Sequence, residues 1–162
     1  MTEVNDLNNI VTNIKQPNKL LDDTFQKKII KILIEDDQFS KDIIDMLKVE
    51  YFDGILPVTI IKYIIEYLEK YGSIPNYDTL LDLIHIKESD DSTKNHLIEF
   101  IRVTKDYKLA DKKHVIFFTK NFCKKQSLKR GLEDAAKAWE DEDYEAIHKI
   151  VMDSMKIGDT KD

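Results

Sequence analysis

Apolar residues recur along most of this chain at the three- and four-residue spacing that places them on one face of an α-helix. Phe25, Ile29, Ile32 and Leu33 form the first set, and Asp22 or Asp23 precedes it as a helix cap. Similar patterns predict further helices over 40–48, 57–72, 77–86, 97–107, 110–138 and 143–156. The chain is therefore expected to be helical almost throughout, with short polar breaks.

Proline and glycine mark the breaks. Pro57 suits the first turn of a helix, where its missing N–H costs nothing, and Gly72 suits the end of that helix. Residues 73–76 are expected to be extended, because a residue before proline disfavours the helical conformation. Four glycines and three prolines are too few for a many-stranded sandwich, which needs a turn about every 8–12 residues. The predicted fold is all-α: a compact helical bundle followed by a long antiparallel helical hairpin.

This pattern divides the chain into four segments. We expect a flexible polar N-terminal arm over 1–21, the helical bundle over 22–108, an oligomerising hairpin over 109–158 and a polar tail over 159–162.

The first helix of the hairpin carries more apolar surface than one neighbouring helix can cover. At about 100° per residue, one stripe spans about 60° and comprises Phe117, Leu128, Leu132, Ala135 and Trp139. A second stripe, rotated by about 90–100°, comprises Val115, Phe118 and Phe122. One stripe can pack on the returning helix, and the other needs either this chain's own bundle or a second protomer. The residues predicted to carry self-association are Phe117, Phe118, Phe122, Leu128, Leu132, Trp139, Tyr144, Ile147 and Val151.

Charge is partitioned along the hairpin. Residues 107–130 hold eight basic side chains and one acid, whereas 131–145 hold seven acids and one lysine. The basic side chains surround the helix instead of forming one stripe, which favours an acidic protein partner over direct DNA binding. The candidate contacts to an acidic partner or nucleic acid are Lys112, Lys113, Lys120, Lys124, Lys125, Lys129 and Arg130. The whole chain has a net charge of −6, which would repel nucleic acid.

No residue pattern indicates catalysis or a cofactor. Three histidines follow an acid by three residues, as in di-iron proteins, but only Glu145 and His148 form the Glu-x-x-His pair, so no metal is expected. Cys123 stands alone and is expected to be a packed or idle thiol. The glycines form neither a Walker A loop nor a Gly-x-Gly-x-x-Gly motif. We therefore assign no catalytic, cofactor-binding or metal-ligating residue and do not expect an enzyme.

The sequence also bears on location. No apolar run approaches the roughly 20 residues of a membrane span, and residues 1–10 lack the basic-then-apolar order of a signal peptide. A single cysteine excludes an intramolecular disulfide. These features predict a soluble protein of the cytoplasm, which would be the host cytoplasm if a phage encodes it.

Two stretches resemble a known family. Residues 121–158 read NFCKKQSLKRGLEDAAKAWEDEDYEAIHKIVMDSMKIG, and residues 51–57 and 60–84 read YFDGILP and IIKYIIEYLEKYGSIPNYDTLLDLI. This pattern resembles the N-terminal region of DnaB-type replicative DNA helicases, especially the phage branch. Members of that family are ATP-dependent 5′–3′ helicases in which an ATPase motor follows the hairpin, whereas no motor follows in this sequence.

The resemblance implies a function. In that family the hairpins pair between subunits, build a dimer or hexameric ring, and the domain docks primase and a helicase loader. The chain is thus interpreted as a non-catalytic scaffold domain of DNA replication. Two alternatives stay open: a stand-alone helical phage regulator that caps or inhibits a helicase, and a small Lys-rich nucleic-acid-binding accessory protein. An excised fragment and a naturally short gene are equally open.

Overall fold

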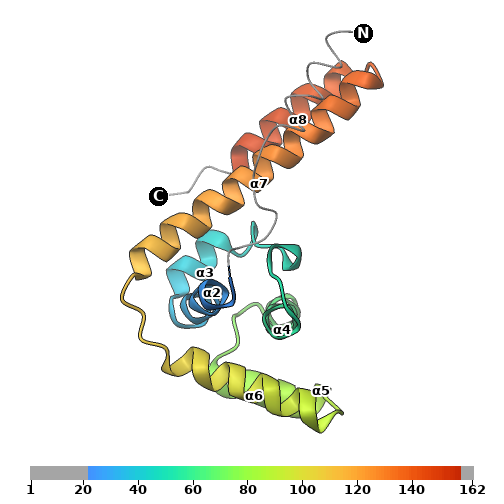
Figure 1. Cartoon of the computed structure of the whole chain (residues 1–162). Coiled ribbons are helices and arrows are strands. Elements are labelled where there is room, and N and C mark those ends of the chain that lie inside the picture. Colours follow the sequence, from blue (N-terminus) through green and yellow to red (C-terminus); the bar gives the residue numbers. More distant parts are fainter. Residues whose placement is uncertain (1–21, 158–162) are drawn as a thin grey trace. The chain divides into compact units, whose positions relative to one another are not determined.

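A computed structural model describes residues 22–157 of the chain (Figure 1). Its α-helices are α2 (Asp23–Glu35), α3 (Asp37–Ile43), α4 (Ile55–Tyr71), α5 (Tyr77–Lys87), α6 (Asp91–Asp106), α7 (Lys112–Glu140) and α8 (Tyr144–Ile157), and a 3₁₀ turn, η1 (Val49–Tyr51), precedes α4. Every regular element in these residues is a helix, which confirms the all-α prediction. The arm expected over 1–21 and the tail expected over 159–162 lie outside the described residues.

The chain divides into two compact units, whose described parts are residues 22–119 and 120–157. We call the first the bundle unit and the second the α7–α8 unit. The division falls inside α7, because the first turns of this helix pack on α2: the rings of Phe118 and Phe25 meet edge to face, with their centroids 5.0 Å apart. Two units joined by α7 are compatible with the predicted bundle followed by a hairpin.

Side-chain caps set where the bundle helices begin. Asp22 accepts the backbone N–H of Phe25 at 3.0 Å, which confirms the cap predicted for the first helix. Asn76 and Asp90 begin α5 and α6 in the same way, each accepting the N–H three residues ahead, at 2.8 and 2.9 Å. Each cap satisfies a donor that has no partner inside the helix.

The second helix differs from its prediction. It spans Asp37–Ile43 instead of 40–48, because the carboxylate of Asp36 accepts the N–H of Phe39 at 3.0 Å and starts the helix earlier. Residues 44–46 then form a turn, although Leu47 beyond it is buried. The apolar spacing identified a buried segment and missed the aspartate that sets its start.

Glycines bound the longest helix of the bundle unit. Gly54 precedes α4 with a φ of 92°, and Gly72 ends it in the left-handed conformation with a φ of 75°. Residues with a Cβ rarely adopt either conformation. Pro57 lies in the first turn of α4, as predicted from its missing N–H.

The core of the bundle unit forms where α2, α4 and α6 contact one another, with α3 packed on α2 and α5 packed on both α4 and α6. Its largest fully buried side chains are Phe39, Phe52, Ile29, Ile30, Ile32, Leu33, Ile43, Ile60, Ile61, Ile64 and Leu80. Burial of each such side chain contributes about 1.5–3 kcal/mol. Within residues 22–157, none of the helices has both the length and the apolar character needed to cross a membrane.

Candidate functional site

Helices α7 and α8 approach each other closely at Gly131. A Cβ atom added there would lie 2.0 Å from Oγ and 2.7 Å from Cβ of Ser154. The Ser154 hydroxyl donates to the carbonyl of Ile150 at 2.8 Å, so this side chain is held on α8. Residues 131 and 154 are almost equally far from the turn at 141–143, and the two helices lie side by side in opposite directions (Figure 1). This contact defines which sides of α7 and α8 face each other.

Five exposed apolar side chains gather on one side of this helical pair. At about 100° per residue, Leu128 and Leu132 lie about 60° and 100° round α7 from Gly131. Val151 and Met155 lie about 60° and 100° round α8 from Ser154, in the same rotational sense. In an antiparallel pair, equal rotations from the contact point to the same side. With Tyr144, which falls at about 80°, these residues form what we call the apolar face: Leu128, Leu132, Tyr144, Val151 and Met155.

The side chains of the apolar face are exposed to solvent. Leu128 and Leu132 are each 37% exposed, and Met155 is 59% exposed. A contiguous apolar patch of this kind is a liability for a protein that stays alone in water and marks an interaction site. The apolar face is therefore the leading candidate functional surface among the described residues.

An acidic turn closes the helical pair. Asp143 begins α8 by accepting the N–H of Ala146 at 3.2 Å, and Glu142 adopts a positive φ of 57°. The ring of Trp139 at the end of α7 meets that of Tyr144 edge to face, with centroids 5.9 Å apart. We call residues 140–145 the acidic tip, because four consecutive acids and Glu145 lie on it.

The structure separates the nine residues predicted to carry self-association. Leu128, Leu132, Tyr144 and Val151 lie on the apolar face, and Trp139 and Ile147 are half-buried. The remaining three are the phenylalanines near the start of α7, which behave differently from one another.

Only one of these phenylalanines is exposed. Phe117 is 67% exposed, whereas Phe118 is half-buried and its ring packs on Phe25 inside the bundle unit. Phe122 is 4% exposed and belongs to the chain's own interior, so it is not accessible to a second copy in this conformation. The amphipathic pattern predicted apolar positions on α7 but could not distinguish those buried within the chain.

The seven predicted basic contacts have different surroundings. Lys112 pairs with Asp36 at 2.9 Å, and Lys120 and Lys129 are half-buried. Lys113, Lys124, Lys125 and Arg130 are exposed. Lys124 and Lys125 lie about 20° and 120° round α7 from Gly131, so they flank the direction of the apolar face at the end opposite the acidic tip.

Ion pairs fasten the start of α7 within the bundle unit. Lys28 donates to Asp111 at 2.9 Å, and Lys112 pairs with Asp36 at the same distance. The hydrogen bond from Lys28 lowers the pKa of Asp111. The backbone N–H of Phe39, followed by Lys112, lowers the pKa of Asp36. Both carboxylates therefore remain charged at neutral pH and hold the connection between α6 and α7 in place.

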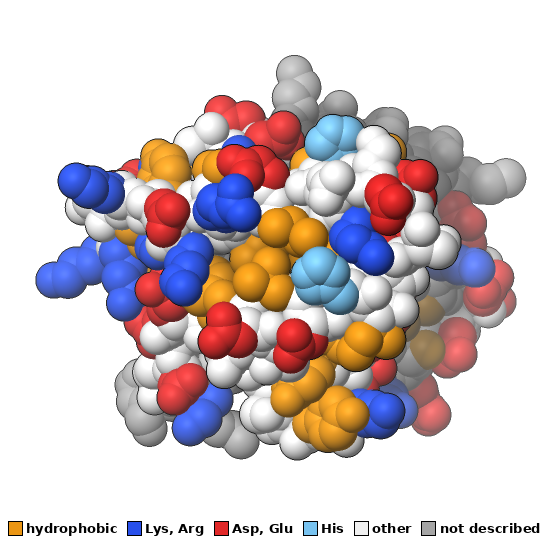
Figure 2. Space-filling model, turned by 90° about the horizontal axis from the view of Figure 1, so that it is seen from below, with side chains coloured by type: hydrophobic (Ala, Val, Ile, Leu, Met, Phe, Trp, Pro, Cys, Tyr) orange, Lys and Arg blue, Asp and Glu red, His pale blue; other side chains and the backbone are white. Residues whose placement is uncertain are grey.

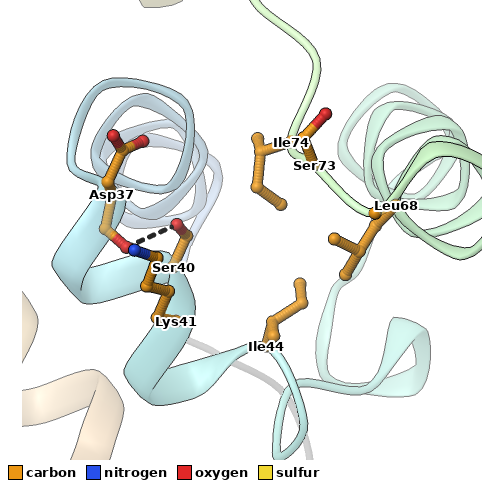
Figure 3. Close-up of a pocket in the computed structure, with 8 residues that line it drawn as sticks. Asp37, Ser40, Lys41, Ile44, Leu68, Ser73 and Ile74 are labelled. Atoms are coloured by element: carbon orange, nitrogen blue, oxygen red, sulfur yellow. Dashed lines mark hydrogen bonds between the residues drawn. The ribbon is translucent and has the colours of Figure 1, made fainter.

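A small pocket lies between α3 and the end of α4 (Figure 3). Its volume is about 250 Å³, below the roughly 300–1,000 Å³ typical of small-molecule sites. Ile44, Leu68 and Ile74 line its interior, and Asp37 and Lys41 place opposite charges beside it. The pocket could hold an apolar side chain, but its lining selects no particular ligand chemistry.

The other described surfaces and groups give weaker indications of a functional site. Seen from the side of α5 and α6, apolar side chains gather near the centre of the view, and both acidic and basic side chains border them (Figure 2). Burial raises the pKa of Cys123 to about 12, so this thiol is not a nucleophile at neutral pH. Within residues 22–157, no group of three or more histidine, cysteine, aspartate or glutamate side chains is arranged to hold a metal ion.

Sequence reasoning missed two parts of the candidate site. Gly131 received no role, although a glycine inside a long helix costs about 1 kcal/mol relative to alanine and so signals close packing. Met155 is not among the residues predicted to carry self-association. Its spacing from Tyr144 and Val151, at i, i+7 and i+11, would have grouped all three on one face of α8.

Comparison with known proteins adds no identification. Neither the family models, the curated proteins nor the solved structures gave a match to this chain.

Proposed function

We propose that this chain is a non-catalytic interaction domain of a DnaB-type replicative DNA helicase of the phage branch. In this role it helps to assemble the helicase ring and docks primase or a helicase loader. The sequence resemblance over 51–84 and 121–158 supports the family, and the all-helical fold is compatible with it. The observation that carries the function is the apolar face, because its five exposed side chains suit a protein partner.

The two units suit different parts of this role. The bundle unit has a continuous core built from α2, α4 and α6, which suits a domain on which a partner docks. The α7–α8 unit exposes most of its large apolar side chains on one side, as expected of helices that pair with another copy. Catalysis has no part in the proposal, since the sequence contains no phosphate-binding glycine loop.

Assembly is tested by substituting glutamine at Leu128 and Leu132 together. We expect the chain to form dimers or larger rings and the double variant to dissociate about 100-fold more readily. Leu128 and Leu132 are each 37% exposed, so burying the exposed part of one leucine contributes roughly 0.5–1 kcal/mol, and a symmetric dimer loses four of them. Light scattering behind a sizing column, across a concentration series, measures the mass. Circular dichroism should show unchanged helicity, because glutamine is a good helix former.

The matched control is glutamine at Ile86 and Val103, which are exposed apolar residues of the bundle unit. This variant should assemble like the parent chain. A parent chain that stays monomeric at every concentration, or a Leu128 and Leu132 variant of unchanged mass, would contradict the assembly role.

The replicative role requires a second measurement. The chain, mixed with the primase of its own replication system, should form a complex that sediments faster than either protein alone. We expect micromolar affinity, because single docking contacts of a multivalent ring are individually weak. Absence of a complex with both primase and loader would remove the replicative assignment while leaving self-assembly intact.

A further inference from the structure

The arm over 1–21 lies outside the described residues, but its sequence carries an amphipathic pattern. At about 100° per residue, five apolar side chains fall within about 120° of a helical wheel, and every polar residue of 4–16 falls outside that sector. The five are Val4, Leu7, Ile10, Val11 and Ile14. Pro17 closes the segment, because the residue before a proline disfavours the helical conformation. The pattern predicts an amphipathic helix over residues 4–15.

Such a helix needs an apolar partner. Isolated helices of about twelve residues are marginal in water, so this one is stable only where its apolar side is covered. The apolar face of the α7–α8 unit has a matching length, since Tyr144 and Met155 are eleven residues of helix apart, about 16 Å. Val4 and Ile14 are ten residues apart, about 15 Å. Tyr144 and Met155 are 60% and 59% exposed, which leaves this face open to a third helix.

The arm is also long enough to reach this face. Asp22 caps α2 one turn before Phe25, and the ring of Phe25 meets that of Phe118 near the start of α7. Leu128 lies ten residues beyond Phe118 on the same helix, about 15 Å further along. The linker 15–21 joins the predicted helix to Asp22, and seven extended residues span up to about 25 Å. This reach places the end of the predicted helix beside Leu128 and its start toward the acidic tip.

We propose that residues 4–15 form an amphipathic helix that docks on the apolar face of the same chain and covers it. Removal of apolar surface from water drives the docking. The docking itself does not require the proposed assembly, but it has a consequence for it, because a second copy must displace the arm to reach the face. A face that is open for only a fraction of the time binds a partner more weakly by that fraction. The arm is thus an internal competitor of assembly.

Hydrogen exchange of the backbone amides tests the docking in the full chain, at a concentration where light scattering shows a monomer. The amides of residues 5–15 should exchange at least about tenfold more slowly than in an unstructured peptide of the same sequence. Leu7→Gln with Val11→Gln should remove this protection, and so should Leu128→Gln with Leu132→Gln on the face. Glutamine is a good helix former, so the loss reports a lost contact and not a lower helix propensity.

The matched control is Asn9→Gln with Asn13→Gln, because both residues lie on the polar side of the predicted helix. This variant should keep the protection within about twofold. Unprotected arm amides in the parent chain overturn the proposal. Protection that survives the change of Leu128 and Leu132 also overturns it, because the arm would then dock elsewhere. Circular dichroism checks the fold of each variant, and Val151→Gln probes the same face from α8 if the α7 variant loses helicity.

The same variants separate this inference from the proposed function. If both hold, Leu7→Gln with Val11→Gln should tighten self-association by about tenfold, because it frees the apolar face. Unchanged self-association of this variant, with its arm released, overturns the competition. A parent chain that assembles although its arm is unprotected overturns the docking alone. A parent chain with a protected arm that stays monomeric at every concentration contradicts the assembly role alone.

Discussion

Replacing Phe39 with alanine is expected to lower the free energy of unfolding by about 3–5 kcal/mol, the usual cost of removing a buried aromatic ring. Phe39 is 2% exposed in α3, which packs on α2. Since domains of this size are stable by only about 5–15 kcal/mol, this single change removes a large share of the stability. Urea unfolding followed by circular dichroism measures the loss.

A comparison with an exposed position separates the effect of burial from the effect of side-chain size. Ile86→Ala also shortens an apolar side chain, but Ile86 is 79% exposed and its loss should cost no more than about 0.5 kcal/mol. Equal effects at the two positions would mean that α3 does not pack in the core as described. The N–H of Phe39 stays bonded to Asp36 in the alanine variant, so the cap of α3 is retained.

Replacing Gly131 with leucine is expected to destabilise the α7–α8 unit by about 3 kcal/mol, at the upper end of the cost of overpacking. Leucine favours the helix by about 1 kcal/mol relative to glycine, so helix propensity alone predicts the opposite sign. The contact decides the outcome, because any Cβ at this position meets both Oγ and Cβ of Ser154. Hydrogen exchange of the backbone amides in α8 measures the effect, and exchange in α4 should not change.

A double-mutant cycle identifies the clash as the cause. Gly131→Ala alone should loosen α8, whereas the same change combined with Ser154→Gly should restore protection, because the second substitution removes both clashing atoms. If the two substitutions have additive effects, the helices do not meet at these positions. That result would also undermine the apolar face, which is defined from this contact.

Much of the bundle unit could be predicted from sequence, because its signals are local. Asp22 and Gly72 bound their helices as expected, since a cap needs only a carboxylate or a glycine at the correct step of the chain. The start of α3 differs from its prediction, because the cap of Asp36 begins the helix three residues before the apolar periodicity does. Helix ends depend on single hydrogen bonds, to which averaged periodicity is insensitive.

The candidate site was less predictable, because it depends on contacts between helices. A helical wheel places Phe117, Phe122 and Leu128 on apolar stripes with no knowledge of which neighbour covers each one. In the structure Phe122 is buried and Leu128 is exposed. The contact between Gly131 and Ser154 supplies the missing reference direction, and no pattern within α7 alone contains it.

The tip of the helical pair also gives the protein a built-in optical probe. Trp139 is the chain's sole tryptophan, and its ring lies 5.9 Å from that of Tyr144, centroid to centroid. Light absorbed by this tyrosine will pass efficiently to the indole at such a separation, and all tryptophan emission arises from one place. Its colour and polarisation therefore report on solvent and tumbling at the end of α7, without any label attached to the chain.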